Sequence, residues 1–232
     1  MRKKRWAVAG AALFLATVCC ACGNKNTNTA PTEQYRIRDT SDPGDTVTTV
    51  PAVSLDFDMG EVIGRAYINE YFGLRMPFPE EWRIFSKAEL AAYSNLTEEE
   101  YTNETVVMLT DNNRLPMVFY ANNDNVEQPE MVTISGIRGI SGRVPAGADP
   151  AAADAYFEEL FGDQKDEFLS TELKTITIGG NDYYWPIYEC PMNDQSLFYG
   201  VIVYGEGAHN LMISVMGPDR ETVEARTHSL FE

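Results

Sequence analysis

Short runs of apolar residues separated by turn residues dominate most of the chain. The runs over 66–69 and 72–78 predict two strands joined by a tight turn at 70–71. The segments 179–182 and 205–207 are typical of hairpin turns, because glycine adopts a positive φ at little cost. Further strands are predicted over 105–110, 116–121, 131–138, 173–178, 183–189, 197–204 and 210–216.

Helix-start signals interrupt these strands. Ser86 and Thr97 each precede a glutamate by three residues, the pattern of a capping box, and each predicts a short helix. Asp149 as an N-cap and Pro150 at the first helical position predict another helix. A last helix follows residue 218, and its predicted inner face consists of Val223, Thr227 and Leu230.

The order of these elements predicts the fold class. Hairpins are followed by helices without a regular β-α-β alternation, so we expect an antiparallel α+β domain. Helices near 86–102, 149–168 and 218–231 would cover both faces of one sheet. The chain has 232 residues, 44% of them hydrophobic, which is enough for one domain with its own core.

The N-terminus has the layout of a secretory signal peptide, with basic residues at 2–5 and an uncharged apolar run over 6–18. The run is shorter than the roughly 20 residues that a membrane-spanning helix needs. The segment resembles a bacterial lipoprotein signal, in which a cysteine after a small residue is lipidated and becomes the new N-terminus. Cys22 after Ala21 fits this pattern best, although Cys19 stands where leucine is usual. An ordinary cleaved signal and an uncleaved anchor are the alternatives.

Charge and composition extend this interpretation. Lys and Arg number 18 and Asp and Glu 35, a net charge of -17, which excludes nonspecific nucleic-acid binding and weakens attraction to anionic headgroups. We expect acyl chains such as palmitate to hold the protein at the cell membrane, facing outside the cytoplasm, with about 0.8 kcal/mol from each buried CH₂. Residues 1–22 are then the signal peptide, 23–60 a disordered polar tether, and 61–232 the folded domain.

Several motifs of the predicted domain occur together in one known family. They are Tyr67 with Asn69, Phe72-Gly73-Leu74, Pro79 before Trp82, the hairpin 176–183, and Ser229-Leu230-Phe231. Over about 64–232 the chain resembles bacterial lipoproteins with a PsbP-like domain. The resemblance implies an α/β/α sandwich around an antiparallel sheet, used as a binding or assembly module, and no shared catalytic residues. Plant relatives are extrinsic photosystem subunits and another relative binds Ran, roles that the lipoprotein signal excludes here.

Catalytic and cofactor motifs are sparse. His209 and His228 have no second histidine or cysteine at zinc-ligand spacing. Ser135 and Ser141 each precede a glycine, but neither lies in G-x-S-x-G. The glycine spacing over 136–142 fits neither a dinucleotide fingerprint nor a P-loop. We therefore assign no catalytic residue and no cofactor.

A calcium site and a reactive cysteine are two further possibilities that the sequence does not favour. The segments 56–61 and 122–127 supply oxygen ligands but lack the 12-residue calcium loop, so no metal residue is assigned. Cys190 is expected to be a small buried residue in a strand.

Aromatic side chains suggest one possible binding surface. Tyr184 and Tyr188 would line one side of their strand, and Tyr183, Trp185 and Ile187 the other. With helices on both sides we expect core, and a carbohydrate- or protein-binding surface is the alternative.

The sequence favours a noncatalytic lipoprotein that binds or assembles a protein or an envelope polymer. An extracytoplasmic hydrolase acting through paired carboxylates is the alternative. The partner and the oligomeric state stay open.

Overall fold

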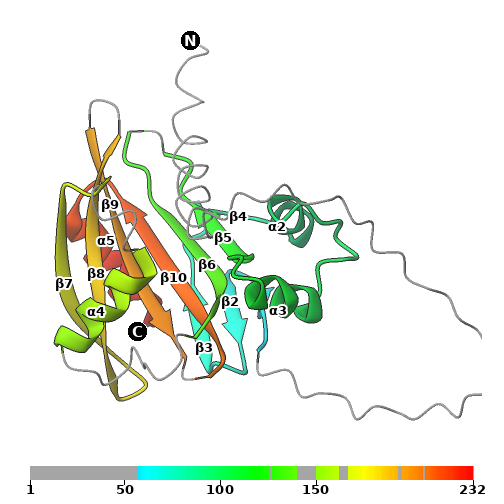
Figure 1. Ribbon diagram of the computed structural model, residues 1–232. Helices are drawn as coiled ribbons and strands as arrows, with labels where there is room; N and C mark the ends of the chain where they lie inside the picture. The colour runs from blue at the N-terminus through cyan, green and yellow to red at the C-terminus, as the bar shows by residue number, and fades with distance from the viewer. Residues whose placement is uncertain are drawn as a thin grey trace, which may run out of the picture. The chain divides into compact units, whose positions relative to one another are not determined.

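The computed structural model describes residues 57–125, 127–139, 150–161, 167–192, 195–205 and 207–231. The signal peptide with Cys22, the tether up to residue 56, Ser141 and Asp149 lie outside the described residues. The expected α+β class is confirmed, because the chain forms antiparallel sheets of three and seven strands together with helices (Figure 1).

The small sheet contains strands β1 (Glu61–Ile63), β2 (Ala66–Asn69) and β3 (Leu74–Pro77), in that order. The two predicted strands are present, and β1 is an addition that pairs with β2. The chain before β1 also belongs to the domain, since Phe57 is only 3% exposed and the Met59 N–H donates to Asn103 Oδ1 at 2.9 Å. Residues 57–60 are therefore packed on the domain.

The large sheet has the strand order β4-β5-β6-β10-β9-β8-β7. Strand β6 occupies the predicted residues, β7 to β10 extend their predicted ranges, and β5 lies one residue later than the predicted 116–121. Neighbouring long strands are antiparallel throughout. The bounds are β4 Arg83–Ile84, β5 Met117–Asn122, β6 Met131–Arg138, β7 Ser170–Ile178, β8 Asn181–Met192, β9 Gln195–Tyr204 and β10 His209–Gly217.

The predicted strand over 105–110 is wrong, because these residues lie in helix α3 (Asn103–Asp111). Thr102 caps the helix by accepting a hydrogen bond from the Thr105 N–H. The β-branched residues favour a strand locally, but Val106 and Thr110, four residues apart, form a buried helical face against β6. Tertiary packing therefore overrides the local preference.

The two capping boxes have different outcomes. Ser86 and Glu89 form the box at the start of helix α2 (Lys87–Tyr93), as predicted. Thr97 and Glu100 also exchange the hydrogen bonds of a capping box, yet only a turn follows, so the helix predicted there is wrong.

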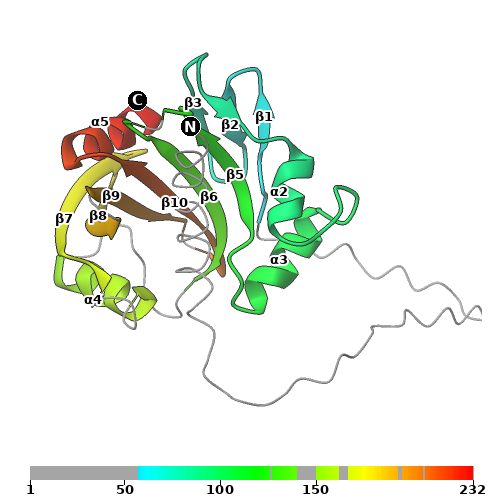
Figure 2. The ribbon, with the colours of Figure 1, turned by 90° about the horizontal axis from the view of Figure 1, so that it is seen from above.

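Helices pack on opposite faces of the large sheet. Helix α5 (Arg220–Phe231) lies on one side and α4 (Pro150–Phe161) on the other (Figure 2). Val223 of α5 packs over Gly200 of β9, beside the buried Trp185 of β8. Phe161 of α4 meets Tyr188, which points to the opposite side of β8. The predicted alternation along β8 is confirmed, because Tyr188 faces α4 and Trp185 faces α5.

Candidate functional site

An aromatic groove lies between α4 and the strands β7 and β8. The Tyr188 ring stacks on Phe168 with 4.4 Å between ring centroids, and Phe161 meets it edge-on at 5.5 Å. The groove has about 440 Å³ of empty volume, including its open mouth. The residues that line it are Asp154, Phe157, Glu158, Phe161, Phe168, Thr171, Leu173, Pro186 and Tyr188.

The sequence places these side chains by two periodicities. Phe157 and Phe161 are four residues apart on α4 and share its buried face. Tyr188 alternates with Ile187 along β8, so it points toward α4 while Ile187 points toward α5. The groove is thus the junction of one helix face and one strand face.

The groove rim is acidic. Asp154 and Glu158 are exposed side chains of α4, and the sequence of this helix contains no lysine or arginine. Burial is the main cause that raises the pKa of the Tyr188 hydroxyl, and the Asp154 charge adds to it. Tyr188 is therefore a neutral phenol at physiological pH. An apolar floor with an acidic rim can bind a group through stacking and through attraction to positive charge.

Cys190 is buried on the same strand, as predicted. The residue is 6% exposed, and desolvation by burial raises the pKa of its thiol to about 12, with smaller contributions from Glu167 and Glu189. The thiol is protonated at neutral pH and is no nucleophile.

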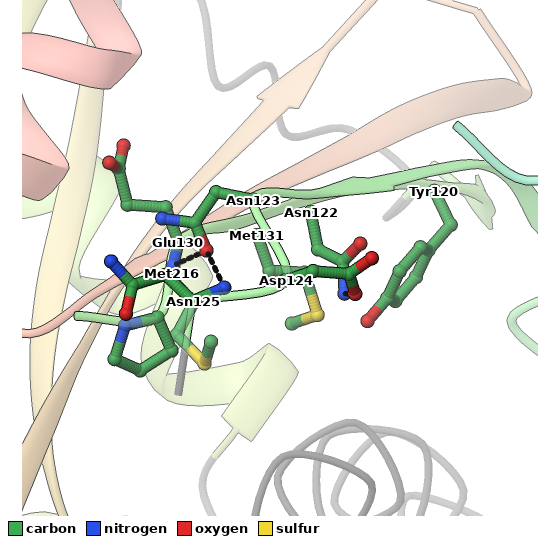
Figure 3. Close-up of a pocket in the computed structure, with 9 residues that line it drawn as sticks. Tyr120, Asn122, Asn123, Asp124, Asn125, Glu130, Met131 and Met216 are labelled. Carbon is green, nitrogen blue, oxygen red and sulfur yellow. Dashed lines mark hydrogen bonds between the residues drawn. The ribbon is translucent and has the colours of Figure 1, made fainter. Parts of the chain in front are cut away.

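A second pocket lies beside the asparagine-rich loop that links β5 to β6. Figure 3 shows the polar ends of Tyr120, Asn122 and Asp124 gathered at one side of this pocket, with Met131 nearby. It holds about 230 Å³ of empty space, including its mouth. Its lining is completed by Asn123, Asn125, Pro129, Glu130 and Met216.

The loop is held by its own asparagine side chains. Asn123 Oδ1 accepts hydrogen bonds from the backbone N–H of Asn125 at 3.0 Å and of Glu130 at 3.1 Å. Asn125 Oδ1 accepts from the N–H of Glu127 and of Gln128. These oxygens are used within the loop, which weakens the interpretation of 122–127 as a calcium site. Within the described ranges, no group of three or more His, Cys, Asp or Glu residues could hold a metal ion.

The other polar residues considered as candidates for catalysis are His209, His228 and Ser135, and each lies in a different part of the fold. His209 Nε2 lies 2.9 Å from Asp111 Oδ1, which joins the start of β10 to the end of α3. His228 is in the last turn of α5. Ser135 is buried in β6 opposite Met212. The structure brings none of these residues together.

Two neighbouring carboxylates, Glu172 and Glu189, do not have the surroundings that the paired-carboxylate alternative requires. Glu172 and Glu189 both approach Arg220, with oxygen–nitrogen distances of 3.2 and 3.6 Å. A hydrogen bond from Lys174 is the largest cause that lowers the pKa of Glu172, and hydrogen bonds from serines lower that of Glu189. A general acid at neutral pH needs a raised pKa instead.

The chain matches no protein-family model and no curated protein. Among the described helices, none is long and apolar enough to cross a membrane.

Proposed function

We propose that this protein is an extracytoplasmic lipoprotein, anchored to the cell membrane through Cys22, whose domain is a noncatalytic binding or assembly module. The partner is a protein or an envelope polymer, and the fold is a PsbP-like sandwich. The signal-like N-terminus supports the anchor. The antiparallel sheet with α4 and α5 on opposite faces supports the fold.

The aromatic groove carries the proposal. Its floor of Phe161, Phe168 and Tyr188 is apolar, and residues of α4 and β7 line it. Stacked aromatic rings bind the apolar faces of sugars and of side chains. The acidic rim of Asp154 and Glu158 favours partners with positive charge near the apolar contact.

Strand β7 offers a matched pair of positions for a test. Thr171 lines the groove, whereas Thr177 is exposed further along the strand and forms no part of the lining. A photo-crosslinking amino acid would replace one or the other in the intact lipoprotein in native membranes. We expect crosslinked product at position 171 and little at 177.

The nature of the product identifies the partner class. A protease-sensitive product indicates a protein, and a product that glycosidases release indicates an envelope polymer. Equal yields at both positions, or none at either, would contradict binding through the groove.

A further inference from the structure

Two carboxylates lie next to the aromatic floor of the groove. Asp154 and Glu158 are exposed residues four positions apart on α4, and both line the groove together with the buried Phe157 and Phe161. Residues at this spacing are neighbours on a helix surface, so the two carboxylates lie side by side. Like charges at this spacing repel each other weakly, and a bound cation would relieve the repulsion.

The sequence around the groove adds to this negative charge. The described lining contains no lysine and no arginine. Residues 154–168, which run from the first lining residue of α4 to Phe168, contain six acidic residues and a single lysine. The ligand group that complements the groove is therefore positively charged.

The apolar part of the lining distinguishes one kind of cation from another. Phe161, Phe168 and Tyr188 contribute aromatic ring surface, and Phe168 is the least buried of the aromatic residues in the lining. Leu173 and Pro186 add apolar side chains. The groove has about 440 Å³ of empty space, including its mouth, which accommodates the tip of a side chain.

Arginine matches both parts of the groove. Its guanidinium group is planar, stacks on aromatic rings and carries five N–H donors in one plane. One face can therefore lie on a ring while the edge donates to two neighbouring carboxylates. A lysine ammonium lacks the flat face and is more strongly hydrated, and a quaternary ammonium has no N–H donor.

We propose that the aromatic groove receives an arginine side chain from a partner protein. The guanidinium lies against the half-buried ring of Phe168, and its N–H groups donate to the carboxylates of Asp154 and Glu158. The inference rests on the proposed function, because it takes the same groove as the binding surface. It goes further by naming a protein as the partner and arginine as the residue that enters the groove.

The first test is a titration of the full-length chain in dodecyl maltoside micelles, followed through the backbone amide signal of Thr171. Thr177, outside the lining, is the reference signal. The probes are Nα-acetyl-arginine methylamide, its citrulline analogue, which has a similar shape without the charge, and its lysine analogue. We expect only the Thr171 signal to shift, and the citrulline compound to bind about tenfold more weakly than the arginine compound. No shift at Thr171, or binding of the citrulline or lysine compound as tight as that of the arginine compound, would overturn the proposal.

Two neighbouring glutamates of α4 provide matched variants. Both are exposed, but Glu158 lines the groove and Glu159 does not. Glu158→Gln should weaken binding of the arginine compound about fivefold, because it removes one of the two charged acceptors, whereas Glu159→Gln should leave binding unchanged. Equal weakening by both variants would indicate general attraction to the acidic helix and would overturn the proposal.

Photo-crosslinking at position 171 separates failure of this inference from failure of the proposed function. A crosslinked product without binding of the arginine compound would keep the groove as a binding surface and overturn the role of arginine. A product that glycosidases release would overturn the protein partner. Binding of the arginine compound without any crosslinked product would contradict the proposed function and the partner protein named here, while the arginine preference of the groove would stand.

Discussion

The guanidinium of Arg226 lies 4.5 Å above the ring of Trp82. Two nitrogens of the same guanidinium approach Glu130 Oε2, each at 3.0 Å. This arrangement joins α5 to the segment before β4 and to the start of β6. One side chain thus connects three distant parts of the sequence.

Arg226→Met should destabilise the domain, because methionine keeps part of the stem but loses the cation–π contact and the charged hydrogen bonds. We expect about 1–3 kcal/mol less free energy of unfolding, measured by denaturant titration. A change below about 0.5 kcal/mol for Arg226→Met would show that the contact contributes little.

Gly200 packs without room for a side chain. A Cβ there would lie 2.4 Å from Trp185 Cζ3 and 2.9 Å from Val223 Cγ1. Gly200→Ala should therefore lower the free energy of unfolding by about 1–3 kcal/mol, because the buried tryptophan or α5 must move. The change is measured by thermal unfolding. The control is Gly207→Ala, where a Cβ would lie no closer than 3.5 Å to its neighbours. Equal melting temperatures for both variants would argue against close packing at Gly200.

The Cys190 thiol should resist alkylation in the folded protein. Its pKa of about 12 leaves almost no thiolate at pH 8, so iodoacetamide should label it only after unfolding. Peptide mass spectrometry distinguishes Cys190 from the N-terminal cysteines. Rapid labelling of the native protein at pH 8 would contradict the buried environment.

The same raised pKa predicts a pH dependence of stability. Above pH 9, the unfolded thiol loses its proton while the folded thiol keeps it, so the contribution of Cys190 to stability falls as pH rises from 9 toward 12. Cys190→Ala should remove this contribution, giving a shallower loss of stability with alkaline pH than the unchanged protein. Identical profiles of stability against pH for Cys190→Ala and the unchanged protein would contradict the raised pKa of this thiol.

The fold was predicted well wherever side-chain periodicity and burial agree. Strand β6 and the inner face of α5 follow directly from their apolar spacing. Helix α3 was missed because Val106 and Val107 favour a strand locally, whereas the sheet against which Val106 packs is distant in sequence. Phe57 was missed for a similar reason, since its partners lie far along the chain.

The candidate sites were harder to predict. The expected core position of Tyr188 is confirmed, since the residue is only 6% exposed. Phe161 and Phe168 join it only through tertiary packing, which the sequence does not indicate. The Asn122 environment depends on side-chain hydrogen bonds across a polar loop. Sequence alone indicates a loop there, and it does not reveal these hydrogen bonds.

The most direct test of the binding-module account is co-purification of the tagged, intact lipoprotein from crosslinked native membranes. Three forms are compared: the unchanged protein, Thr171→Trp, which fills the groove, and Thr177→Trp, which adds the same side chain outside it. The account predicts one stoichiometric partner, protein or polymer, that Thr171→Trp loses and Thr177→Trp retains. Retention by both variants, or recovery of no partner from the unchanged protein, would contradict it.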